Sequence, residues 1–155
     1  MIRAPRSVRR RWLACGLVAA ACFATAGCSP VYSPSGQLAQ SASDASAQAQ
    51  TAALTLHLVA TQQLPAPAAQ TALSDATDKL AQDASALTSA DVSGHLAAAR
   101  GRILSRLRTG QDLLIQARTL VGGQAGPGAT DAVVQRLQAT AKALTALEKQ
   151  LQASG

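Results

Sequence analysis

The chain has 155 residues, enough for one domain with a short appendage, and 48% of them are hydrophobic while only 2% are aromatic. Its formal net charge is +6, yet five of the 14 basic residues are arginines that lie before residue 12. From residue 28 onward, nine Lys and Arg stand against eight Asp and Glu, a net charge of +1. The basic excess therefore belongs to the first residues, so we expect no nucleic-acid partner for the rest of the chain.

The first 27 residues have the layout of an export signal. Residues 1–12 (MIRAPRSVRRRW) are basic, and residues 13–26 (LACGLVAAACFATA) are uncharged and apolar. These are the charged and apolar regions of a signal peptide. The stretch 12–26 has 15 residues, fewer than the roughly 20 that a membrane span needs. We therefore expect this segment to be an export signal rather than a membrane span.

The end of this segment resembles the lipobox of bacterial lipoproteins. Thr25, Ala26 and Gly27 precede Cys28, and the last three of these four residues match the family pattern of small residues before a cysteine. Thr25 stands where that family usually has an aliphatic residue. The resemblance implies that the Cys28 thiol receives a diacylglycerol and that the leader is cut before Cys28. It also implies an extracytoplasmic protein held by lipid on the cell membrane or the outer membrane.

Other interpretations of the leader stay open. Residues 24–26 (ATA) form an A-x-A site, so ordinary cleavage after Ala26 would release a secreted, soluble protein. An uncleaved signal anchor is a second alternative, and a merely buried Cys28 is a third. Residues 9–13 (RRRWL) resemble the twin-arginine export pattern, which leaves the export route open as well. Once the leader is removed, Cys28 is the last cysteine in the chain, so we expect no intramolecular disulfide.

The remainder of the chain is predicted to be helical. Residues 28–36 are predicted to be the lipidated cysteine and a flexible tether, because SPVYSPSG contains two prolines, a glycine and three serines. Residues 37–153 are rich in Ala, Leu, Gln and Arg, which favour helix. Three breaks divide this part: LPAPA at 64–68, LTSADVSG at 87–94 and GGQAGPG at 122–128. The helices between them are predicted at about 37–63, 68–88, 92–121 and 130–153.

Apolar residues recur at spacings of three, four and seven in each of these segments, which places them on one face of a helix. The clearest series are Leu73, Leu80 and Leu87, then Ile103, Leu107 and Leu114, and finally Val133, Leu137, Leu144 and Leu151. Short connections favour antiparallel neighbours, so the sequence predicts an all-α, up-down-up-down four-helix bundle. Pro67 suits the first turn of the second helix. Ser89 or Asp91 is the expected N-cap of the third helix, and Thr130 or Asp131 that of the fourth.

Few residues are available for catalysis. After the leader the chain has two histidines, one glutamate and one tyrosine, and it contains no recognisable catalytic or phosphate-binding motif. We therefore expect no catalytic site, no cofactor and no metal site. A metal site made by His57, His95 and Asp91 is the alternative, but two histidines far apart in sequence are a weak signal. Three aspartates of the second helix are expected to form a solvated acidic face: Asp75, Asp78 and Asp83.

The most concentrated charge is RGRILSRLR, which contains Arg100, Arg102, Arg106 and Arg108. Arg102 and Arg106 are one helical turn apart, whereas Arg108 points elsewhere. These arginines predict a patch for an anionic partner, which would be lipid head groups, a cell-wall polymer or an acidic protein surface. The competing interpretation, which we favour from the sequence, is that they pair with the aspartates of the second helix across the bundle.

These features predict a cell-envelope lipoprotein that acts as a non-enzymatic, membrane-anchored helical interaction module. Its expected partners are the membrane, through the lipid anchor, and an envelope protein or an anionic surface polymer. The alternative function is a carrier that holds a hydrophobic or anionic lipid-like ligand between its apolar stripes.

Overall fold

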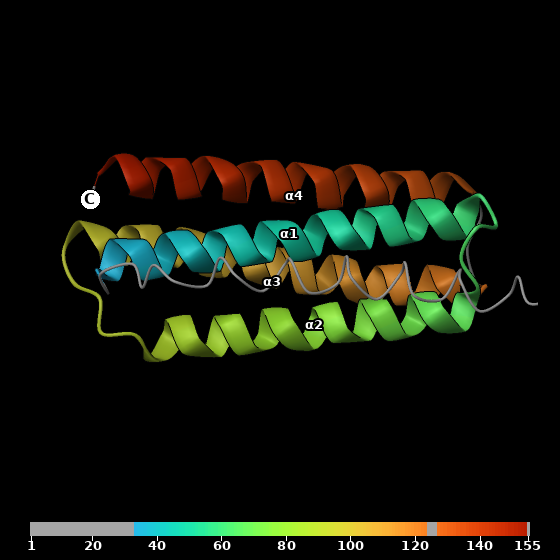
Figure 1. Cartoon of the computed structure of the whole chain (residues 1–155), viewed down its shortest axis with the longest axis horizontal. Helices are drawn as coiled ribbons and strands as arrows, with labels where there is room; N and C mark the ends of the chain where they lie inside the picture. Colours follow the sequence, from blue (N-terminus) through green and yellow to red (C-terminus); the bar gives the residue numbers. More distant parts are fainter. Residues whose placement is uncertain (1–32, 124–126, 155) are drawn as a thin grey trace, which may run out of the picture. The chain divides into compact units, whose positions relative to one another are not determined.

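Four long α-helices make up the described part of the chain (Figure 1). They are α1 (Pro34–Ala60), α2 (Ala66–Ser89), α3 (His95–Val121) and α4 (Pro127–Ala153). The computed structural model describes residues 33–123 and 127–154, which belong to one compact unit, Ser33–Gly155. The predicted signal peptide, the lipobox residues Thr25, Ala26 and Gly27, and the lipidation site Cys28 lie outside the described residues.

Each helix runs antiparallel to the next one along the chain, so α1 and α3 begin at one end of the bundle, while α2 and α4 begin at the other (Figure 1). α1 packs most extensively on α4, and α2 packs most extensively on α3. α1 also approaches α3 across the bundle, whereas the described backbones of α2 and α4 do not come close to each other. The predicted all-α, up-down-up-down four-helix bundle is therefore confirmed.

The predicted apolar stripes form the core. Each helix turns one apolar face inward, and the core cluster consists of Leu, Ala, Ile and Val, because the last Phe, Tyr or Trp in the sequence is Tyr32. The largest fully buried side chains are Leu38, Leu56, Leu73, Leu80, Ile103, Leu107, Leu113, Leu114, Leu137 and Leu144.

Small residues bring α1 close to α4. Ala42, Ala45 and Ala49 of α1 are at most 1% exposed. On the same helix, the Ser46 hydroxyl donates to the backbone oxygen of Ala141 at 3.2 Å. Because a serine side chain is short, this bond requires the two helix backbones to approach closely. We call this contact, lined by alanine and serine, the α1–α4 seam.

The first two helices begin earlier than predicted. α1 starts at Pro34 rather than at 37, so the last three residues of the predicted tether, 34–36, form its first turn. The reason is a side-chain cap, because Ser33 Oγ accepts a hydrogen bond from the Gly36 amide at 3.1 Å. Pro34 then fits the first turn, where a proline loses no helical hydrogen bond. Pro67 lies in the first turn of α2, as predicted.

The predicted caps of the last two helices are wrong. α3 begins at His95 instead of 92, and its N-cap is Gly94, whose φ of 62° favours glycine. Ser89 is the last residue of α2, and Asp91 lies in the connection. α4 begins at Pro127 rather than at 130, so Thr130 and Asp131 lie inside the helix. A proline in the opening turn explains this early start, since its fixed φ suits that turn.

Two glycines inside α3 provide a matched test of the packing between α2 and α3. A Cβ at the exposed Gly101 would meet nothing within 4 Å, whereas a Cβ at the buried Gly110 would lie 3.1 Å from Leu80 Cδ1. We expect Gly101→Ala to raise the free energy of unfolding by about 0.5–1 kcal/mol, because alanine restricts the unfolded chain. Gly110→Ala should gain less, because Leu80 must shift. Equal gains in urea denaturation would contradict this packing.

Candidate functional site

The four clustered arginines of α3 do not act as one group. Arg100 is partly buried, and its Nη1 donates to the backbone oxygen of Ala90 at 2.7 Å, which ties the start of α3 to the end of α2. Arg102 and Arg106 are exposed and one turn apart on α3. Arg108 is also exposed, but it follows Arg106 by two positions and therefore lies about 200° around the helix. The predicted cluster thus reduces to a pair, which we call the Arg102–Arg106 patch.

The favoured interpretation of these arginines, pairing with the aspartates of the second helix, is wrong. Within residues 33–123 and 127–154, the single ion pair joins Lys79 Nζ and Asp83 Oδ1 at 3.6 Å, and both residues belong to α2. The reason is geometric: Arg100 is used by the backbone at Ala90, and the Arg102–Arg106 patch lies outside ion-pair distance of every described carboxylate.

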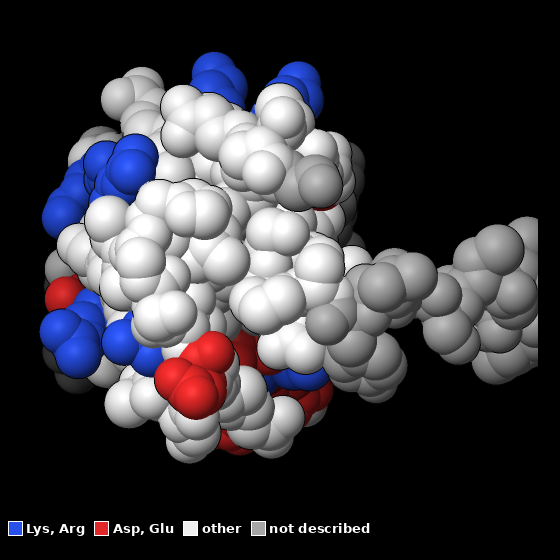
Figure 2. All heavy atoms as spheres, turned by 90° about the vertical axis from the view of Figure 1, so that its left-hand side faces the viewer, with Lys and Arg blue, Asp and Glu red and all other residues white. Residues whose placement is uncertain are grey.

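Charge is segregated between the two halves of the bundle. α1 and α2 carry four aspartates and one lysine, a net charge of −3, whereas α3 and α4 carry eight basic and three acidic residues, a net charge of +5. Figure 2 looks at the end where α1 begins, and there Lys and Arg gather over the left and upper sides, while Asp and Glu gather over the lower side. The nearly neutral bundle therefore presents a basic side and an acidic side.

The histidines do not meet. His57 is exposed near the end of α1, and His95 is exposed at the start of α3. Because α1 and α3 run in the same direction and each spans about 40 Å, these two residues lie near opposite ends of the bundle. No group of three His, Cys, Asp or Glu suited to a metal ion occurs among the described residues.

The predicted acidic face of α2 is only partly solvated. Asp75 and Asp78 are exposed, but the Asp83 side chain is 13% exposed, and its Oδ2 is buried without a hydrogen-bond partner. Burial raises the pKa of the Asp83 carboxyl; the charge of Lys79 opposes this shift, and the carboxylate of Asp44 on α1 adds to it. Sequence periodicity missed this residue because burial of one carboxyl depends on how closely α1 and α2 approach.

Neutralising this carboxyl should stabilise the bundle. We expect Asp83→Asn to raise the free energy of unfolding at pH 7 by about 0.5–1 kcal/mol, because the poorly solvated charge is lost while the exposed Lys79 partner contributes little. A raised native pKa means that the folded chain binds this proton more tightly than the unfolded chain does. The advantage of the variant should therefore grow as the pH rises from the ordinary aspartate pKa, about 3.9, through the raised value.

Chemical denaturation at several pH values measures this difference. The matched control is Asp78→Asn, which removes an exposed carboxylate from the same helix and should change the free energy of unfolding by no more than about 0.5 kcal/mol. An advantage of Asp83→Asn that stays constant from pH 3 to pH 7 would contradict the assigned burial.

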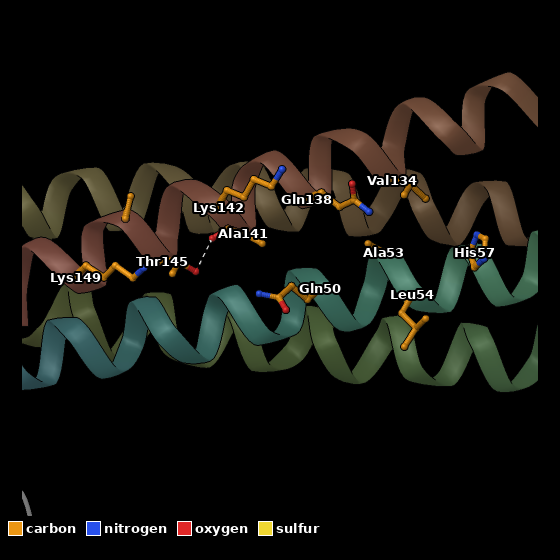
Figure 3. Close-up of a pocket in the computed structure, with 11 residues that line it drawn as sticks. Gln50, Ala53, Leu54, His57, Val134, Gln138, Ala141, Lys142, Thr145 and Lys149 are labelled. Carbon is orange, nitrogen blue, oxygen red and sulfur yellow. Dashed lines mark hydrogen bonds between the residues drawn. The ribbon is translucent and has the colours of Figure 1, made fainter.

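An open groove of about 770 Å³ runs between α1 and α4 on the outer side of the α1–α4 seam (Figure 3). Ala53 and Ala141 line its inner part, and Lys142 and Lys149 of α4 stand along it. Thr145 also lines it and donates to the Ala141 backbone oxygen at 3.1 Å. The groove combines small apolar groups with two lysines, a set that suits an elongated, anionic, partly apolar molecule.

Two large hydrophobic side chains are exposed beside surface hollows. Leu54 of α1, at the α1–α4 groove, is 57% exposed, and Ile115 of α3 is 55% exposed. Ile115 adjoins a hollow of about 400 Å³ between α3 and α4. Leu54 and Ile115 each lie six residues before the end of their helix, and these helices are parallel, so both side chains lie at the same level of the bundle.

The chain matches no protein-family model, no curated protein and no solved structure. None of the helices in the described ranges has an apolar stretch long enough to cross a bilayer.

Proposed function

We propose that this chain is a non-enzymatic, lipid-anchored interaction module of the cell envelope. In this proposal Cys28 carries the lipid, and the bundle docks an envelope partner. The lipobox-like residues before Cys28 support the anchor. The observation that carries the docking role is that Leu54 and Ile115 are each more than half exposed and each adjoin a surface hollow.

The fold supports a defined placement of this docking surface. Ser33 follows Cys28 by five residues, and a chain of that length spans at most about 18 Å. An anchor at Cys28 would therefore keep the end where α1 begins close to the lipid. Leu54 lies 20 residues further along α1, a rise of about 30 Å, so the two hydrophobic side chains would lie far from the anchored end of the bundle.

Mass analysis of the membrane fraction tests the anchor. The expected result is a chain that begins at Cys28 and carries added acyl mass, together with release of Cys28→Ser into the soluble fraction. A chain that begins at Gly27 with a free thiol would overturn it.

Site-specific photo-crosslinking in the native host tests the docking surface. A crosslinker at position 54 or 115 should give a discrete product of one defined mass, and the same crosslinker at the exposed Ala47 should not. Identical products from all three positions would contradict a defined docking surface.

The α1–α4 groove favours a second candidate function, carriage of an anionic lipid-like molecule. Its alanine-lined inner part would hold an acyl chain, and Lys142 and Lys149 would bind the anionic group. Native mass spectrometry should then detect co-purified lipid, which Lys142→Glu with Lys149→Glu would remove. Protein free of lipid in the native preparation would exclude this function.

A further inference from the structure

The up-down-up-down topology places the Arg102–Arg106 patch in the half of the bundle where α1 begins. α3 starts at the same end as α1, and Arg102 and Arg106 follow the start of α3 by seven and 11 residues, a rise of about 10 and 16 Å. About 70 residues separate Ser33 from the patch in the sequence, and the bundle topology brings them to the same end.

We infer that the Arg102–Arg106 patch binds the anionic head groups of phospholipids and holds the bundle against the membrane. The inference rests on the proposed anchor at Cys28, which limits Ser33 to about 18 Å from the lipid. Both guanidinium groups are exposed, and they lie outside ion-pair distance of every described carboxylate. At that range from the lipid they can reach the phosphate layer.

Charge segregation favours this orientation over its opposite. The basic half formed by α3 and α4 is attracted to an anionic surface, and the acidic half formed by α1 and α2 is repelled by it. Each basic residue near an anionic leaflet contributes about 1 kcal/mol, so the pair should change the ratio of docked to undocked bundle about 30-fold. Guanidinium also binds phosphate in a bidentate manner, which adds to the simple attraction of charge.

The mature chain permits a sensitive test, because it contains no tryptophan after the leader. The lipidated chain with Ser105→Trp, an exposed position next to Arg106, is placed on phosphatidylcholine vesicles with or without phosphatidylglycerol. Spin labels at the head groups quench this tryptophan when the bundle docks. Quenching is expected to be strong on anionic vesicles, weak on neutral vesicles and abolished in 1 M salt, where the Debye length falls to about 3 Å.

Two double variants with the same change in net charge separate position from charge. Arg102→Glu with Arg106→Glu should abolish the quenching on anionic vesicles. Arg118→Glu with Arg136→Glu changes the net charge of α3 and α4 equally but lies near the end of the bundle opposite the start of α1, so it should retain more of the quenching than the first double variant. Equal quenching on both kinds of vesicle, or equal loss in both double variants, would overturn the inference.

Failure of the anchor can be distinguished from failure of the patch. Sedimentation with neutral vesicles reports the acyl group alone, since the patch has no anionic lipid to bind there. If the chain stays in solution, coupling the free Cys28 thiol to a maleimide lipid restores the tether, and the same quenching comparison then tests the patch. A cell-wall polymer or an acidic protein as the true partner would leave quenching independent of phosphatidylglycerol.

Discussion

Replacing Ala49 by leucine is expected to lower the free energy of unfolding by about 2–3 kcal/mol, one of the largest effects of a single substitution in this bundle. Ala49 is 1% exposed and lies one turn from Ser46, whose hydroxyl reaches the Ala141 backbone oxygen. Three additional carbon atoms cannot enter the α1–α4 seam unless the two helices separate. Separation would also break the Ser46 hydrogen bond and leave a buried carbonyl with a poorer partner.

The matched control for this substitution is Ala47→Leu on the exposed side of α1. It adds the same atoms to the same helix and should change the free energy of unfolding by no more than about 0.5 kcal/mol. Both values come from urea denaturation followed by circular dichroism at 222 nm. Similar stabilities for the two variants would show that the seam has room for a larger side chain.

Leu114→Ala is expected to cost about 2–5 kcal/mol, because it leaves a cavity in an already slender core. Leu114 is fully buried, and the bundle has no aromatic side chain that could move into the space. Since small domains are stable by about 5–15 kcal/mol in total, this loss would remove a large share of the stability.

Ile115→Ala is the matched control for Leu114→Ala. It shortens an aliphatic side chain at the next position of α3, where 55% of the residue is already exposed. The loss should stay below about 1 kcal/mol, because less apolar surface returns to water. A loss as large as that of Leu114→Ala would mean that Ile115 is buried in solution, as it would be in a stable self-association.

Most of the fold could be predicted from the sequence, because alanine and leucine favour helix and their spacing shows which face of each helix is buried. The predicted bounds are right to within three residues, and the errors have local causes: the Ser33 cap and the prolines that open α1 and α4. The pairing of helices could not be predicted. Nothing in a periodic pattern says that α1 packs mainly on α4, or that Asp83 becomes buried near Asp44.

The candidate site was predictable only in part, for the same reason. The sequence shows the arginines as one run. Their division into a bound Arg100 and the exposed Arg102–Arg106 patch depends on the backbone oxygen of Ala90, which accepts from Arg100, and on the position of each residue along the bundle axis. The α1–α4 groove and the matching levels of Leu54 and Ile115 exist only once α1, α3 and α4 are assembled. The lipobox prediction concerns residues outside the described ranges.

The extensive contact between the first and last helices also determines when the protein can fold. Ser46 finds its partner Ala141 95 residues further along the chain, so the loop that closes this contact is long and forms slowly. Until α4 emerges, α1 lacks the helix on which it packs most extensively, whereas the neighbouring α2 and α3 can already pair as a hairpin. A chain that emerges from its amino terminus would therefore stay incompletely folded until nearly all of α4 is free to pack.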